Sequence, residues 1–175
     1  VLTTNTTNGI IPRIIHRTWE YRYVDSGMFH KCHTKWIDED DSYIQTWSTG
    51  TGRYHFMKSL GGRLFNVYNK LKPGAFKADL WRLCVLYKYG GVYIDGHSSP
   101  YKSLEYILRD CFETEYIHKM VTILDPQESG GGLNNGFIAC TPKHPFIIQY
   151  IKDVINNVEN NLYTDSSLGV TGPIC

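Results

Sequence analysis

A carboxylate and an imidazole stand two residues apart in the segment Asp95-Gly96-His97, directly after the apolar run Val92-Tyr93-Ile94. In extended backbone, residues i and i+2 point to the same side, and the intervening glycine lets a ligand approach closely. Mixed oxygen and nitrogen ligation suits Mn²⁺, Zn²⁺ or Fe²⁺ better than Ca²⁺. The spacing therefore predicts half of a divalent-metal site, with positions left open for phosphate oxygens. The alternative is a common Asp-Gly turn followed by an exposed histidine.

A second pair of charged residues, Asp79 and Arg82, precedes this segment in a stretch that reads as one helix over 75–89. Its apolar residues recur at helical spacing, and Gly90-Gly91 ends it as a C-terminal cap. Residues three apart are neighbours on a helix surface. The pair is either an ordinary ion pair worth ~0.3–0.5 kcal/mol, or a buried pair that requires a polar ligand.

The elements that must position these residues alternate between strands and helices. Predicted strands are rich in β-branched or alternating apolar residues and lie at 11–19, 42–47, 92–94, 116–124 and 133–140. Predicted helices have apolar residues three and four apart and lie within 53–71, interrupted by a double glycine, and at 75–89, 103–112 and 145–162. Such alternation predicts an α/β domain with a mostly parallel central sheet flanked by helices. Ligands of these sheets bind outside the carboxyl ends of strands, which is where Asp95 and His97 fall.

Length, composition and net charge limit the classes of protein to which this chain can belong. The chain has 175 residues, which fits one domain, with 42% apolar and 20% charged residues as in globular proteins. The net charge of +1 gives no broad electrostatic surface for nucleic acid or anionic membranes. No apolar run approaches the ~20 residues of a membrane span. We expect the acidic run 38–41 to be a solvated loop, and His30, His33, His55 and His118 to lie at the surface.

The N-terminal residues and the cysteines indicate the cellular compartment in which we expect the protein. Residues 1–10 read as a flexible lead-in without the features of a signal peptide, and they lack an initiator methionine, so we expect a preceding segment to be missing. The five cysteines form no CxxC pair, which argues against structural zinc and a disulfide framework. Free thiols and no leader favour the cytoplasm, and the Golgi lumen is the alternative if an N-terminal anchor has been removed.

Five segments of this chain, taken together and in order, resemble one enzyme family. The segments are IPRIIHRTW at 11–19, KADLWRLCVLYKYGGVYIDGH at 77–97, PYKSLE at 100–105, NNGFIACTPKHPF at 134–146 and TGP at 171–173. They resemble the glycosyltransferases with a DXD-containing sugar-binding region, which include initiating α-1,6-mannosyltransferases, capsular polysaccharide transferases and viral sugar transferases. The resemblance covers about residues 11–173, and its central block is highly specific.

The resemblance implies a GT-A fold, one Rossmann-like catalytic domain over 1–175. It implies transfer of a sugar from a UDP- or GDP-sugar to a glycan or glycoprotein acceptor, with retention at the anomeric carbon. It further implies Mn²⁺ (or Mg²⁺) on the donor diphosphate, and no nucleic-acid partner. Hydrolysis of simple phosphate esters by the same metal ligands, and a non-catalytic module that binds nucleotide sugars or glycans, are the alternative functions.

Residue by residue, the resemblance implies that Asp95, Asp79 and Arg82 are catalytic and bind the donor, with Asp95 and His97 on the metal. His97 replaces the second acid of the DXD pattern, as in the DXH pattern of the transferases that add GalNAc to polypeptides. The other implied donor contacts are His16, Thr18 and Trp19 at the nucleotide pocket, and Asn135 and His144 on the sugar side. Family members continue past Thr171-Gly172-Pro173, so we expect a shortened C-terminus and a third metal ligand that lies outside this sequence or is a water.

Overall fold

The computed structural model describes residues 9–21, 27–112, 119–124, 132–162 and 171. Within these ranges the strands are β1 (Ile14–Thr18), β2 (Ile44–Ser48), β3 (Gly91–Ile94), β4 (Met120–Leu124) and β5 (Leu133–Cys140). The helices are α1 (Met28–Glu39), α2 (Gly50–Leu60), α3 (Gly62–Lys70), α4 (Gly74–Tyr89), α5 (Leu104–Phe112) and α6 (Pro145–Glu159). Most of the expected lead-in, residues 1–8, lies outside the described ranges.

The strands form one sheet in the order β2-β1-β3-β5-β4. Strand β1 pairs in parallel with β2 and with β3, while β5 runs antiparallel to both β3 and β4. Four strands therefore point the same way and only β5 is reversed, so the predicted mostly parallel sheet is confirmed. The register pairs His16 with Tyr93 and Ile94 with Phe137, which brings the carboxyl ends of β1 and β3 together beside the middle of β5.

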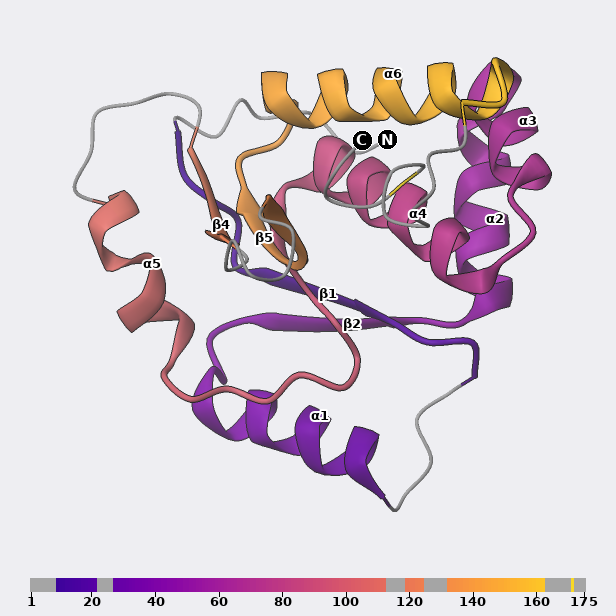
Figure 1. Cartoon of the computed structure of the whole chain (residues 1–175). Coiled ribbons are helices and arrows are strands. Elements are labelled where there is room, and N and C mark those ends of the chain that lie inside the picture. The colour runs from indigo at the N-terminus through magenta and orange to yellow at the C-terminus, as the bar shows by residue number, and fades with distance from the viewer. Residues whose placement is uncertain (1–8, 22–26, 113–118, 125–131, 163–170, 172–175) are drawn as a thin grey trace.

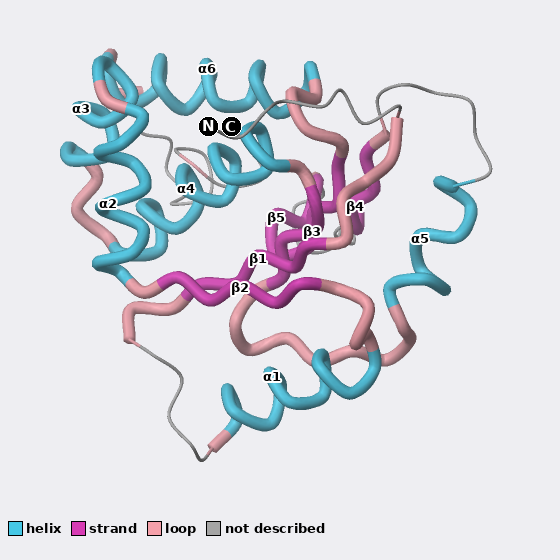
Figure 2. Tube along the Cα trace, turned by 180° about the vertical axis from the view of Figure 1, so that it is seen from behind, coloured by secondary structure: helices cyan, strands magenta, loops and turns pink. Residues whose placement is uncertain are grey.

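Helices cover both faces of the sheet, with α2, α3, α4 and α6 on one side and α1 and α5 on the other (Figures 1 and 2). The strands alternate between two cores accordingly. Tyr93 and Ile138 pack in one core with α2, α3, α4 and α6, whereas Val92, Ile94 and Phe137 pack in the other with α1 and α5. The same alternation assigns Asp95, one residue beyond the end of β3, to the face of α4.

Helix α4 is buried on more than one side, because it lies between the sheet and α6 (Figure 1). Its buried residues run without a break from Leu80 to Leu86 and include Arg82. The helix ends at Gly90, whose φ is 65°, and a Cβ there would lie 2.7 Å from Cδ of Pro142. Only glycine fits this position, because both the backbone angle and the space exclude a side chain.

The acidic run between α1 and β2 differs from its expected state. Asp40 is only 3% exposed, and its Oδ1 accepts a 2.9 Å hydrogen bond from the backbone N–H of Leu104 at the start of α5. The prediction of a solvated loop is therefore wrong for this residue, because the carboxylate caps a helix that is distant in sequence. Among the described residues, no helix combines the length and apolar character needed to cross a membrane.

Candidate functional site

The backbone of Asp95-Gly96-His97 is a turn, not extended chain. The N–H of Ser98 donates to the carbonyl of Asp95 at 3.0 Å, and the N–H of Asp95 donates to the carbonyl of Gly136 at 2.9 Å. The expectation of an extended segment is therefore wrong, and His97 is exposed. In the part of the chain that the structure describes, no three His, Cys, Asp or Glu side chains group closely enough to hold a metal ion. Metal binding by Asp95 and His97 stays a prediction.

Three consecutive carbonyl groups of this turn are bound by side chains from β1 and α1, and we call these donors the carbonyl clamp. Arg17 Nη2 donates to the oxygen of Gly96 at 2.7 Å. Cys32 Sγ donates to the oxygen of His97 at 3.1 Å, and Trp36 Nε1 to that of Ser98 at 2.9 Å. The clamp fixes the backbone that carries Asp95 and His97, because each buried carbonyl has found its donor.

Arg17 is fully buried beneath the turn. Its guanidinium lies over the ring of Trp47, 5.4 Å from the centroid, and its Nη1 is 3.3 Å from Nδ1 of His33. Burial lowers the pKa of Arg17 to about 10, so the side chain remains a cation at neutral pH. Burial and the charge of Arg17 lower the pKa of His33. The surface position expected for His33 is wrong, because this ring packs against Arg17.

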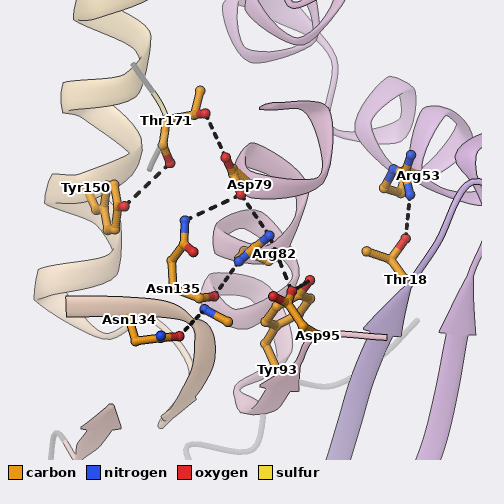
Figure 3. A network of polar contacts seen from close by, with 11 residues as sticks. Thr18, Arg53, Asp79, Arg82, Tyr93, Asp95, Asn134, Asn135, Tyr150 and Thr171 are labelled. Atoms are coloured by element: carbon orange, nitrogen blue, oxygen red, sulfur yellow. Dashed lines mark hydrogen bonds and ion pairs between the residues drawn. The ribbon is translucent and has the colours of Figure 1, made fainter. Parts of the chain in front are cut away.

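Helix α4 and the end of β3 bring two carboxylates to one buried arginine (Figure 3). Arg82 Nη2 lies 2.7 Å from Asp79 Oδ1 and 3.6 Å from Asp95 Oδ1. The hydroxyl of Tyr93 donates to Asp95 Oδ1 at 2.7 Å, and the guanidinium of Arg82 lies 4.4 Å from the centroid of the Tyr93 ring. The expected proximity of Asp79 and Arg82 is confirmed, and the pair is buried, not solvated.

The charges in this cluster depend on one another. Burial opposes the charge of Arg82, but Tyr93, Asp79 and Asp95 together outweigh it and raise the pKa of the guanidinium. Burial also raises the pKa of Asp79, although Arg82 and a hydroxyl from Thr171 oppose that shift. Burial raises the pKa of Tyr93, so its hydroxyl stays protonated and keeps donating to Asp95. Arg82 is therefore a fixed cation between two acids.

Segments from the C-terminal third complete this cluster. Arg82 Nη1 donates to the carbonyl of Asn135, and Asn135 Nδ2 lies 3.4 Å from Asp79 Oδ1. Thr171 Oγ1 donates to Asp79 Oδ2 at 2.8 Å, and the hydroxyl of Tyr150 on α6 lies 3.5 Å from the carbonyl of Thr171 (Figure 3). We call Asp79, Arg82, Asp95, Asn135 and Thr171 the arginine-carboxylate cluster.

Gly136 leaves room for Asp95. A Cβ at this position would lie 2.8 Å from Asp95 Oδ2 and 2.9 Å from Asn134 Oδ1. Asn134 Oδ1 already accepts a 2.8 Å hydrogen bond from the N–H of Gly136. A side chain at Gly136 would therefore displace either the carboxylate of Asp95 or the side chain of Asn134.

The side chains of His16 and Thr18 on β1, which the sequence predicts to contact the donor, bind other groups of the protein. His16 is buried, with Nε2 2.9 Å from the carbonyl of Gly90 and Nδ1 3.2 Å from Thr46 Oγ1. Thr18 Oγ1 donates to the carbonyl of Ser48 at 2.6 Å and accepts from Arg53 at 2.7 Å. Figure 3 shows Thr18 and Arg53 apart from the arginine-carboxylate cluster. These side chains hold the strand, so a donor contact by either would have to compete with a bond within the protein.

Two other predicted contacts lie at element ends. Trp19 follows β1 and is 44% exposed, and its contact with a base stays a prediction. His144 is the N-cap of α6, where Nδ1 accepts a hydrogen bond from the N–H of Phe146 at 3.2 Å. The structure therefore brings Asp79, Arg82, Asp95 and Asn135 together and leaves His144 at a helix terminus.

Sequence reasoning missed several residues of the site, namely Arg17, Tyr93, Gly136 and Thr171 as contributors to its geometry. A charge inside a β-branched strand, as with Arg17, is a local signal, because such a cation is buried only with partners. The contact of Thr171 with Asp79 has no local signal, since the two residues are 92 positions apart.

The arrangement suits a polyhydroxylated ligand that carries phosphate. A carboxylate accepts hydrogen bonds from hydroxyl groups, and a guanidinium binds phosphate or sugar oxygens through several donors. The oxygen of Asp95 and a ring nitrogen of His97 also form a donor set that fits a divalent ion such as Mn²⁺. The site therefore has the chemistry for binding a sugar nucleotide.

Comparisons with known proteins agree with this chemistry. Residues 17–113, just over half of the chain, match the family described as "Glycosyltransferase sugar-binding region containing DXD motif". Inositol phosphoceramide mannosyltransferase 1 of Schizosaccharomyces pombe is 28% identical over 147 residues, which are 82% of this chain and 43% of that protein. Mannosyl phosphorylinositol ceramide synthase CSH1 of Saccharomyces cerevisiae is 25% identical over 167 residues, which are 94% of this chain and 41% of that protein.

The chain thus spans about two fifths of the length of these relatives. A solved structure, PaToxG Glycosyltransferase, superposes with a TM-score of 0.72 at 17% identity and covers 93% of this chain and 66% of that one. At this identity the likeness shows the fold alone, and it confirms the expected GT-A architecture.

Proposed function

Because this chain belongs to the glycosyltransferase family whose sugar-binding region contains a DXD motif, we propose that it transfers a sugar from a nucleotide-sugar donor to a hydroxyl group. One observation carries the proposal most directly. A buried arginine, Arg82, bridges Asp79 on α4 and Asp95 at the carboxyl end of β3. In an α/β sheet this is the edge where ligands bind.

Each residue of the arginine-carboxylate cluster then has a role. Asp79 accepts hydrogen bonds from hydroxyls of the donor sugar and orients the anomeric carbon, while Asn135 and Thr171 hold its carboxylate. Arg82 binds a sugar or phosphate oxygen and pairs with the carboxylates of Asp79 and Asp95. Tyr93 fixes the rotamer of Asp95 by its hydrogen bond.

Asp95 and His97 are the residues that would hold a Mn²⁺ or Mg²⁺ ion. A divalent ion bound to the donor diphosphate stabilises the negative charge of the leaving group. The carbonyl clamp supports both ligands from below by holding the backbone of the turn that carries them. In the proposed complex, Trp19 at the end of β1 stacks on the base of a UDP- or GDP-sugar.

In the proposed reaction, the bond between the anomeric carbon and the diphosphate oxygen breaks, and a bond from the acceptor hydroxyl oxygen forms. A glycan or a glycoprotein is the acceptor that the family resemblance implies, and the reaction itself requires only that the acceptor presents a hydroxyl group. Retention of configuration follows if the new bond forms on the face that the leaving group vacates. The hydroxyl proton then passes to the departing diphosphate, so that no separate general base is required.

Donor hydrolysis tests this function without knowledge of the acceptor. A panel of UDP- and GDP-sugars is incubated with Mn²⁺ or Mg²⁺, and released nucleotide is measured for the wild type and for Asp95→Asn. We expect hydrolysis of at least one donor, and a loss of about a hundredfold or more in the variant. Asp41→Asn, at an exposed carboxylate before β2, is the matched control and should leave the rate unchanged.

Three outcomes would contradict the proposal. Equal hydrolysis by wild type and Asp95→Asn would remove Asp95 from the mechanism. Calorimetric binding of a nucleotide sugar with no turnover over long incubation would support a non-catalytic binding module instead. Cleavage of simple phosphate esters would support a phosphohydrolase, a reaction that leaves the sugar-facing position of Asp79 without a purpose.

A further inference from the structure

A cavity of about 500 Å³ is lined by residues of the Asp95 turn, of α5 and of the strands β4 and β5. Its lining includes Asp95 and His97 and also Asn134 and Gly136. The volume falls within the ~300–1,000 Å³ that small-molecule sites occupy. The cavity therefore shares two residues with the proposed donor site and is large enough for a second substrate.

Most of its wall is apolar. Trp36 and Phe137 are buried beneath it, and Val121 is partly buried. Apolar side chains at its rim remain exposed: Tyr101 is 96% exposed, Ile123 54% and Ile107 39%. A cluster of exposed apolar residues around a concave site is typical of a surface that covers an apolar ligand.

The lining of the cavity combines polar and apolar side chains from different elements. Asp95 and His97 come from the turn after β3, whereas Ile107 comes from α5 and Ile123 from β4, the edge strand beyond β5. Helix α5 lies beside the edge of the sheet formed by β4 (Figures 1 and 2). An occupant would therefore place a polar head at Asp95 and an apolar body between α5 and β4.

We propose that this cavity is the acceptor site and that the acceptor is amphipathic, with a hydroxylated head joined to an apolar chain or ring. The inference rests on the proposed transfer reaction. That reaction needs the acceptor hydroxyl beside the anomeric carbon, whose leaving phosphate is held at Asp95 and His97. The hydroxyl oxygen bonds to that carbon, the diphosphate leaves, and the proton departs with the diphosphate. The apolar wall adds affinity for the part of the acceptor that does not react.

Pairs of acceptors that differ only in their apolar group test the proposal. Octyl glycosides and the matching methyl glycosides, below the micelle concentration, are compared as acceptors with a hydrolysed donor from the panel. We expect kcat/KM to be at least tenfold higher for an octyl glycoside, since each buried methylene favours binding several-fold. Ile123→Asp should bring that ratio close to one while donor hydrolysis stays unchanged.

Ile44→Asp is the matched control, because Ile44 is an exposed isoleucine on β2, the opposite edge strand of the sheet. It should keep the octyl preference. Equal use of octyl and methyl glycosides by the wild type, or an unchanged preference in Ile123→Asp, would overturn the proposal.

Direct binding separates this inference from the proposed function. If no donor is turned over, octyl glycoside binding is followed by tryptophan fluorescence, since Trp36 lines the cavity. Binding that Ile123→Asp abolishes and Ile44→Asp retains would support an amphipathic ligand even without catalysis. Absent binding, or equal binding by Ile123→Asp and the wild type, would refute the site.

Discussion

Arg17 Nη2 donates a 2.7 Å hydrogen bond to the carbonyl oxygen of Gly96, the residue between the two proposed metal ligands. The contact joins a strand near the N-terminus to a turn 79 residues later. Arg17 thus holds the backbone of the site without contacting the side chain of either proposed metal ligand. The residues that position the turn are therefore different from the residues proposed to bind the ion.

Trp36→Phe removes the indole donor to the carbonyl of Ser98 and keeps an aromatic ring in the core. We expect a loss of about 1–3 kcal/mol in the free energy of unfolding. The Mn²⁺ concentration for half-maximal donor hydrolysis should also rise, because the turn that carries His97 loosens. Trp81→Phe is the control: its Nε1 has no hydrogen-bond partner among the described residues, so the metal response should stay constant. An equal metal response in both variants would contradict a positioning role for Trp36.

Gly136→Ala places a Cβ 2.8 Å from Asp95 Oδ2. Because the carboxylate must move to admit it, we expect donor hydrolysis to fall at least tenfold, measured as kcat/KM. Gly52→Ala is a matched substitution in the first turn of α2, where the nearest atom is 3.7 Å away. That variant should keep full activity and gain up to about 1 kcal/mol of stability from helix propensity. Full activity in Gly136→Ala would mean that Asp95 needs no fixed position.

Thr171→Val keeps the shape of the side chain and removes the hydroxyl that donates to Asp79 Oδ2 at 2.8 Å. A hydrogen bond to a charged group contributes about 1.5–3 kcal/mol, so the free energy of unfolding should fall by that order. Donor hydrolysis should fall as well, because Asp79 loses one of its supports. Thr171→Ser restores the donor and should recover most of both losses. No difference between the two variants would show that the contact contributes nothing.

Stability should decline on acidification through His16. Burial lowers the pKa of this ring below 6.5, although the hydrogen bond to Gly90 opposes the shift. The unfolded chain then binds a proton more readily than the folded one as the pH falls below 6.5. The stabilisation that comes from the neutral His16 ring is complete above that pH and is lost as the pH falls through the folded-state pKa. Urea unfolding at pH 7.5 and 5.5 should show this difference, with His33 adding in the same direction.

His16→Gln should reduce the difference between the two pH values, and His55→Gln, at an exposed histidine of α2, should leave it as in the wild type. Burial raises the pKa values of Asp40 and Asp79, so these two carboxyl groups increase the free energy of unfolding as the pH falls. The comparison between variants isolates His16, because those carboxylates are common to all of them. An unchanged pH dependence in His16→Gln would contradict the assignment.

Local sequence was sufficient for most of the elements, with α1 (Met28–Glu39) as an exception, and for one contact. The apolar spacing over 75–89 and the glycines after it predicted α4 and β3, because helix period and chain reversal are properties of neighbouring residues. Asp79 and Arg82 meet at 2.7 Å for the same reason, since helix geometry alone makes residues three apart adjacent. The order of the five segments that resemble the family also indicated the family, although no single segment was sufficient.

Tertiary packing decided the rest of the site. The Asp-Gly turn was the alternative that local sequence offered, but its anchoring is tertiary: Arg17 and Cys32 bind the carbonyl groups of Gly96 and His97, and Trp36 binds that of Ser98. Thr171 reaches Asp79 across 92 positions. Such contacts join segments that no local pattern relates, because they depend on which buried polar groups find partners once the helices and sheet have packed. The sequence alone determined which residues could do chemistry, and the folded core determined which of them share one site.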